Sequence, residues 1–74
     1  MPIIQVKVID EVFTPAQKKE MIQKLTDAMV AVEGEKMRSL TTVLIEDIRS
    51  GEWGLGGKVM TTEAVRALAT GSKG

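Results

Sequence analysis

Residues 14–33 read TPAQKKEMIQKLTDAMVAVE and predict one helix that begins at Pro15 and runs to the end of this stretch. Thr14 suits the N-cap position, Pro15 suits the first helical position, and Gln17 completes a capping box. Gly34 follows directly, and glycine favours the position just past a helix end. Apolar residues recur at helical spacing and form one stripe. They are Met21, Ile22, Leu25, Ala28, Met29 and Val32.

Strands are predicted on both sides of this helix. Residues 2–9, PIIQVKVI, place Ile4, Val6 and Val8 on one strand face, which we expect to be the core face. Residues 40–48, LTTVLIEDI, form the second strand. Two strands joined by a helix make a β-α-β unit with parallel strands and a right-handed crossover. The expected fold class is therefore α/β (α+β).

The last third of the chain is rich in glycine. Residues 51–57, GEWGLGG, predict a tight hairpin or loop, because glycine tolerates positive φ angles. A short helix is expected over residues 63–69, capped by Thr61 or Thr62. Residues 71–74 are expected to fray.

Composition narrows the function. A chain of 74 residues is predicted to form a single domain over residues 1–74. Ten basic and ten acidic residues give no net charge, which argues against partners held by bulk charge, such as nucleic acid or an anionic membrane. No apolar run could span a membrane and the amino terminus lacks the pattern of a signal peptide, so we expect a cytoplasmic protein. The chain contains no Cys and no His. A general base near pH 7 must then be a shifted Lys, a shifted carboxylate or the amino terminus.

The sheet predicts an oligomer. One helix covers one face of two strands, which leaves Ile3, Ile9, Leu44 and Ile48 on the other face. An exposed two-stranded sheet is not stable alone, and chains of this size depend on disulfides, metals or association. We therefore expect other copies of the chain to extend and cover the sheet.

Two residues are candidates for chemistry. Methionine is normally removed before a small second residue, which would leave Pro2 as a secondary amine able to act as a base. With Met1 retained, the Pro2 nitrogen is an amide and has no basic lone pair. The simpler interpretation is that Pro2 is an ordinary residue at the start of a strand. Trp53, in the glycine-rich segment, either anchors an interface or walls a pocket.

Four motifs, taken together in this order, resemble the 4-oxalocrotonate tautomerase family over about residues 2–58. They are Pro2-Ile-Ile-Gln-Val, Thr14-Pro-Ala-Gln-Lys18, Ile45-Glu-Asp-Ile48 and Gly51-Glu-Trp-Gly-Leu-Gly-Gly57. The resemblance implies a β-α-β unit assembled as a hexamer, a trimer of dimers. It also implies that an amino-terminal proline moves a proton between carbons of a 2-hydroxydienoate or similar enol acid, with no cofactor.

The resemblance assigns site residues. Pro2 matches the catalytic proline, Trp53 the aromatic wall of the pocket, and Ile9 and Leu55 apolar pocket positions. The family's two substrate-binding arginines are not matched: residues 10–13 read DEVF in place of the first, and Thr42 stands at the second.

Arg38 is a candidate replacement for these arginines. If the second strand extends back to residue 38, an even spacing places Arg38 and Thr42 on one face, so Arg38 of a neighbouring subunit could bind a substrate carboxylate. The alternative is a solvated surface residue.

The sequence thus predicts a cofactor-independent tautomerase that uses Pro2 as general base on a small 2-hydroxy-enoic or 2-oxo acid. The alternative is a non-catalytic or arginine-deficient subunit, or a binding protein on the same scaffold. The expected partners are a small carboxylate and other chains in a homo-hexamer or hetero-hexamer, with no nucleic acid or membrane.

Overall fold

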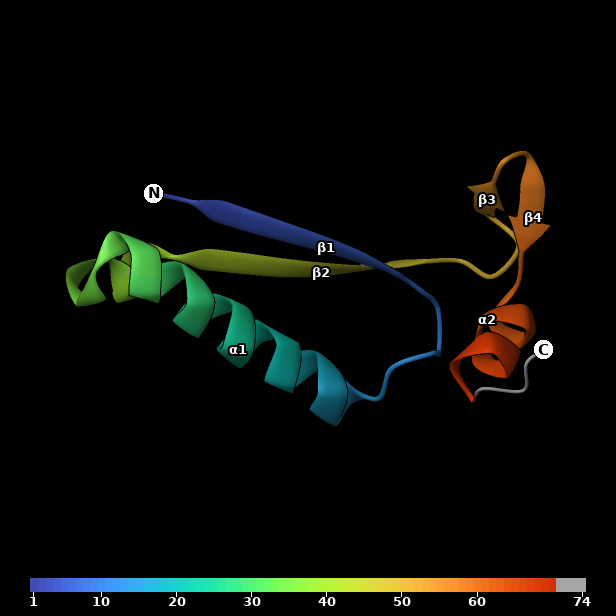
Figure 1. Ribbon diagram of the computed structural model, residues 1–74, viewed down its shortest axis with the longest axis horizontal. Helices are drawn as coiled ribbons and strands as arrows, with labels where there is room; N and C mark the ends of the chain where they lie inside the picture. Colours follow the sequence, from blue (N-terminus) through green and yellow to red (C-terminus); the bar gives the residue numbers. More distant parts are fainter. Residues whose placement is uncertain (71–74) are drawn as a thin grey trace. The chain divides into compact units, whose positions relative to one another are not determined.

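The computed structural model describes residues 1–70 and has the predicted elements in the predicted order, with one 3-10 helix in addition (Figure 1). These are β1 (Ile3–Ile9), α1 (Pro15–Glu33), a 3-10 helix η1 (Glu35–Leu40), β2 (Thr42–Ile48), β3 (Trp53–Leu55), β4 (Lys58–Met60) and α2 (Thr62–Ala69). The expected β-α-β unit, glycine-rich hairpin and short final helix are all present, which confirms the fold class. The frayed tail predicted for residues 71–74 lies outside the described residues.

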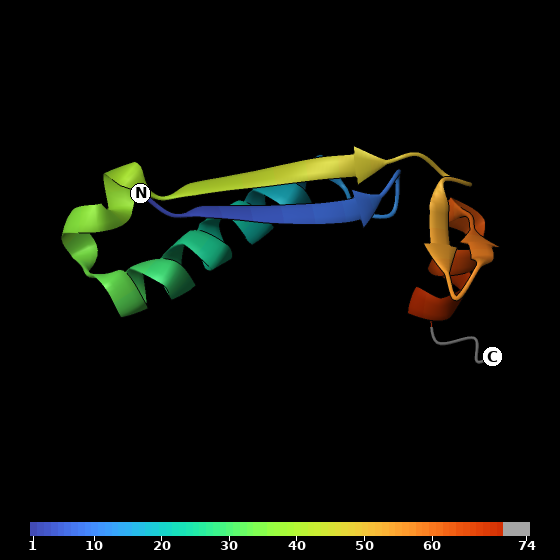
Figure 2. The same ribbon diagram turned by 90° about the horizontal axis from the view of Figure 1, so that it is seen from above.

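The strands β1 and β2 pair in parallel to form a two-stranded sheet. The Thr42 N–H donates to the Pro2 carbonyl at 3.1 Å where the strands begin, and the Asp10 N–H donates to the Ile48 carbonyl at 2.7 Å where they end. Figure 2 shows the two arrows side by side and pointing the same way. The strand predicted over residues 40–48 is shorter than expected, because η1 occupies the chain up to Leu40.

Contacts divide the chain into two compact units. The first unit combines Met1–Val6 with Thr14–Glu46, and the second combines Lys7–Phe13 with the residues from Asp47 onwards. Each unit therefore contains a part of β1 and a part of β2.

In the first unit, α1 begins and ends where the sequence predicts. The Thr14 N–H donates to Gln17 Oε1 at 2.9 Å, and the Gln17 N–H donates to Thr14 Oγ1 at 3.1 Å, so the capping box is complete. At the other end the Gly34 N–H donates to the Val30 carbonyl at 2.8 Å, with Gly34 at a φ of 107°. The helix boundaries follow from these local contacts.

The buried side of α1 is turned relative to the predicted stripe. Met21, Leu25 and Met29 are half-buried, as the stripe requires. Val32 was expected on the same side but is 85% exposed, whereas Val30, outside the stripe, is buried. Which apolar residue of a helix is buried depends on which one another part of the chain covers, and apolar character alone does not determine this.

In the second unit, β3 and β4 form an antiparallel hairpin. Trp53 stands opposite Met60, and Leu55 stands opposite Lys58. The turn between the strands consists of two glycines, Gly56 and Gly57, whose φ angles are 59° and 85°. Positive φ at both turn residues suits the twist of a two-residue hairpin, so the glycine-rich segment is a hairpin because of its turn.

The helix α2 is fastened to the segment that follows β1. Thr62 is 4% exposed; its Oγ1 donates to the Asp10 carbonyl at 2.6 Å and its N–H donates to Ser50 Oγ at 2.9 Å. Arg66 Nη2 donates to the carbonyl of Glu11, a non-glycine residue with a φ of 63°. These side chains tie the helix to two consecutive carbonyls after β1.

Replacing Thr62 by Val is expected to lower the free energy of unfolding by about 1–3 kcal/mol, because the shape is kept while the Asp10 carbonyl loses a buried donor. Thr62→Ser keeps the hydroxyl and should recover most of the loss. Thr70→Val is the matched control, since the Thr70 hydroxyl donates to a carbonyl at an exposed helix end. Urea unfolding measures all three. Equal losses for Thr62→Val and Thr70→Val would show that the Thr62 contact does not stabilise the fold.

Candidate functional site

The site residues predicted from the sequence fall into two groups, one in each unit. The first unit contains Pro2, Arg38 and Thr42, and the second contains Ile9, Trp53 and Leu55.

Pro2 and Thr42 lie next to each other. The Thr42 N–H donates to the Pro2 carbonyl at 3.1 Å, and both residues are half-buried. Met1, which precedes them, is 85% exposed and lies outside β1, which begins at Ile3. Removal of Met1 would therefore convert the Pro2 nitrogen from an amide to an amine without removing a residue of the sheet.

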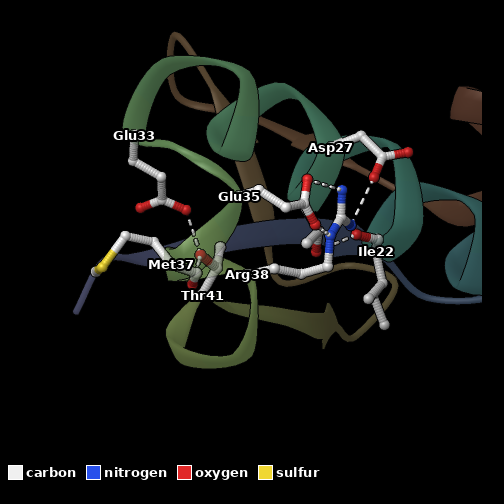
Figure 3. Close-up of polar contacts among 8 residues, drawn as sticks. Ile22, Asp27, Glu33, Glu35, Met37, Arg38 and Thr41 are labelled. Atoms are coloured by element: carbon white, nitrogen blue, oxygen red, sulfur yellow. Dashed lines mark hydrogen bonds and ion pairs between the residues drawn. The ribbon is translucent and has the colours of Figure 1, made fainter.

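Arg38 lies on η1, so the second strand does not extend back to residue 38 and the condition for a strand face shared with Thr42 is not met. Its Nε donates to Glu35 Oε2 at 2.5 Å, and its Nη1 donates to Asp27 Oδ1 at 2.8 Å (Figure 3). The guanidinium lines an open hollow of about 400 Å3 on the first unit. The other lining residues are Ile22, Gln23, Thr26 and Asp27.

The charges around Arg38 favour cations over anions. The Arg38 guanidinium lowers the pKa of the Glu35 carboxyl by hydrogen bonding, and the hydrogen bonds that Arg38 donates to Glu35 and to Asp27 raise the pKa of Arg38. One cation thus faces two carboxylates. A substrate carboxylate would have to displace one of them, so binding through Arg38, with a neighbouring subunit, stays a prediction.

The Glu35–Arg38 pair predicts an acid-sensitive contribution to stability. Because the folded chain holds the Glu35 pKa below its usual value of 4.5, the contribution is complete above that value and is lost as the pH falls through the folded pKa. Glu35→Gln should therefore lower the urea midpoint at pH 7, and this difference should shrink progressively as the pH falls below 4.5. In an Arg38→Gln background the same substitution should show no such pH dependence. A difference that persists unchanged to pH 3 would contradict the pairing.

The segment η1 was not predicted, although the sequence carries a signal for it. Glu35 and Arg38 stand three residues apart, a spacing that brings side chains together on a helical turn. Thr41, directly after η1, links this 3-10 helix to the end of α1. Its hydroxyl contacts the Glu33 carboxylate of α1 and the Met37 carbonyl of η1, the latter at 2.8 Å (Figure 3).

In the second unit, Trp53 lines a hollow of about 290 Å3, named here the Trp53 hollow. Its lining residues are Lys7, Ile48, Glu52, Trp53 and Gly54. Leu55 lies two residues further along β3 and is exposed, whereas Ile9 is 5% exposed and belongs to the core of this unit. Of the three predicted pocket residues in this unit, Trp53 lines this hollow, and Ile9 and Leu55 are not among its lining residues.

Residues 1–70 place no three Asp or Glu side chains where they could hold a metal ion together. Over the same residues, no helix combines the length and hydropathy that a bilayer-spanning segment needs.

Comparison with known proteins identifies the family. The family model described as "Tautomerase enzyme" matches residues 2–63. The chain belongs to the tautomerase family. It is 30% identical over 67 residues to the probable tautomerase K2 of Dickeya dadantii (strain 3937), covering 90% of this chain and 98% of that protein. It is also 35% identical over 60 residues to probable tautomerases of Helicobacter pylori strains 26695 and J99, covering 78% of this chain and 87% of each relative.

Membership in this family supports an isomerase-type activity for the chain. The matched region begins at Pro2, leaves Met1 outside and ends at Glu63, in the first turn of α2. It therefore includes both strands of the sheet and the whole Trp53 hairpin.

Proposed function

We propose that the protein is a cofactor-independent tautomerase whose general base is the amino group of Pro2 after removal of Met1. The observation that carries the proposal is that the match to the tautomerase family begins at Pro2 itself. The proposed substrate is a small 2-hydroxy-enoic acid or the enol of a 2-oxo acid, the class implied by the resemblance to 4-oxalocrotonate tautomerases.

The reaction is a proton transfer that an amine can perform alone. The Pro2 nitrogen accepts the enol O–H proton, a proton is returned to carbon, and the C=C–OH unit becomes CH–C=O with no net change in atoms or electrons. An α-amino group has a reference pKa of about 7.7–8, close enough to neutrality to exchange protons with substrate. This tautomerase has no His that could take that role.

We further propose a homo-hexamer in the cytoplasm. Support comes from the first unit, where Ile3 and Leu44 are 63% and 47% exposed on the strands of a small sheet. Apolar strand surface of this kind is stabilised when another copy of the sheet covers it. A hetero-hexamer, with a related chain supplying arginines, is the second form of this proposal.

A second candidate function is a non-catalytic or arginine-deficient subunit or binding protein on the tautomerase scaffold. The specific observation in its favour is the segment after β1, where residues 10–13 read DEVF, together with Thr42 at the second arginine position. A dianionic substrate buried without cations would be costly, so a monoacid is expected for either function.

An assay on protein of defined amino terminus tests the proposal. Intact-mass spectrometry first establishes whether the natively produced chain begins at Pro2 and whether a second subunit accompanies it. The ultraviolet absorbance of 2-hydroxy-2,4-pentadienoate then reports ketonisation. We expect the protein to accelerate this reaction over buffer. No acceleration by a chain that begins at Pro2 would reject the enzyme, and co-purification of a related chain would favour the second candidate function.

A further inference from the structure

The Trp53 hollow combines an apolar wall with a cation. Its volume of about 290 Å3 is near the lower end for small-molecule sites, which suits a compact acid. Trp53 and Ile48 supply apolar surface, and Lys7 supplies an ammonium group on a flexible stem. This is the combination that an enol acid requires: a flat apolar wall for its carbon chain and a positive charge for its carboxylate.

Lys7 is better suited to an anion than Arg38 is. Both Nε and Nη1 of Arg38 are already bonded to carboxylates, Glu35 at 2.5 Å and Asp27 at 2.8 Å. An ammonium has three donors and can keep its existing interaction while it binds one further oxygen. Lys7 also lies in the same hollow as Trp53, the residue matched to the family's pocket wall.

We propose that Lys7 binds the substrate carboxylate in the Trp53 hollow, and that Glu52 restricts this hollow to monoanions. The inference rests on the proposed function for the identity of the substrate as an enol or oxo acid, and on the proposed hexamer for the base. Pro2 precedes β1 and Lys7 is five residues further along the extended chain, about 16 Å at the rise of a strand, so the Pro2 amine that reacts is that of another copy of the chain. Lys7 and Glu52 both line the hollow and carry opposite charges. One carboxylate is paired by the ammonium, whereas a second carboxylate in the same open hollow is repelled by the like charge of Glu52.

Tryptophan fluorescence tests binding without any need for turnover, because Trp53 is the single Trp of the chain. The probes are 2-oxopentanoate, its neutral methyl ester and the dianion 2-oxoglutarate. Lys7→Gln should weaken the binding of 2-oxopentanoate about 10-fold or more and leave the binding of the ester unchanged, while Lys7→Arg should retain binding of the acid. Glu52→Gln should strengthen the binding of 2-oxoglutarate several-fold, because it removes the like charge.

The matched control is Lys58→Gln, which removes an exposed lysine from β4 of the same hairpin and does not line the hollow. The proposal would be overturned if Lys58→Gln weakened the binding of 2-oxopentanoate as much as Lys7→Gln does. It would also be overturned if Lys7→Gln weakened binding of the methyl ester as well as the acid, or if Arg38→Gln weakened binding of the acid and Lys7→Gln did not. Absence of 2-oxopentanoate binding to the unmodified protein would overturn it as well.

Turnover separates this inference from the proposed function. If the protein ketonises 2-hydroxy-2,4-pentadienoate, Lys7→Gln should raise KM about 10-fold and change kcat little. An unchanged KM would remove Lys7 from the site while the tautomerase function stands. Fluorescence-detected binding through Lys7 without turnover would reject the tautomerase function while the anion site stands.

Discussion

Protein that begins at Pro2 is expected to ketonise 2-hydroxy-2,4-pentadienoate about 10²–10⁴ times faster than the same chain with Met1 retained. The factor is the usual contribution of a positioned general base, and an amide nitrogen cannot supply it. Because Met1 is 85% exposed and precedes β1, its presence or absence should leave the sheet unchanged. The difference in rate would then report the chemistry of the Pro2 nitrogen.

The two forms are separated by mass and compared by kcat/KM across pH 5–9. The form that begins at Pro2 should gain rate as the amine loses its proton and then level off above the amine pKa, while the retained form should lack this step. Pro2→Ala keeps a primary amine after processing and should retain part of the rate. Equal rates for the two forms of the unmodified sequence would show that Pro2 is not the base.

Leu44→Lys is expected to abolish assembly. Leu44 and Ile3 are the exposed large apolar residues on the strands of the first unit, and a lysine at the centre of a buried sheet face would leave a charge without solvent. Sedimentation velocity at micromolar concentration should show six copies of the 8.0 kDa chain for the unmodified protein and a smaller species for the variant.

Val32→Lys is the control for this change, because it places the same charge on an exposed apolar residue of α1. It should leave the sedimentation coefficient as it is. A stable 8.0 kDa monomer of the unmodified chain would contradict the hexamer outright. An intact hexamer for Leu44→Lys would show that this face is not the interface.

Features set by neighbouring residues were predictable from the sequence. The boundaries of α1 follow from Thr14, Gln17 and Gly34, whose hydrogen bonds span three or four residues. The hairpin follows from two adjacent glycines with positive φ. Such contacts need no knowledge of the rest of the chain.

Features that depend on distant contacts were not predictable. Arg38 bonds to Asp27, eleven residues away, and lies on a 3-10 turn, so the second strand does not extend back to it as the argument for a shared face with Thr42 required. Lys7 is an ordinary exposed residue in the alternation of β1, and the structure places it in one hollow with Trp53, which is far away in sequence. The exchange of Val30 for Val32 in the buried face of α1 has the same origin.

The hydrogen bonds from α2 to the segment after β1 come from two side chains, Thr62 and Arg66. The Asp10 carbonyl is bound by Thr62, within the matched region, whereas the Glu11 carbonyl is bound by Arg66, three residues beyond it. A chain cut after Glu63 would keep the hydrogen bond from Thr62 and lose the one from Arg66. The lost hydrogen bond is the one to Glu11, whose backbone is in the left-handed region. The length of the loop after β1 and the presence of a cationic residue in the last helix should therefore vary together during divergence.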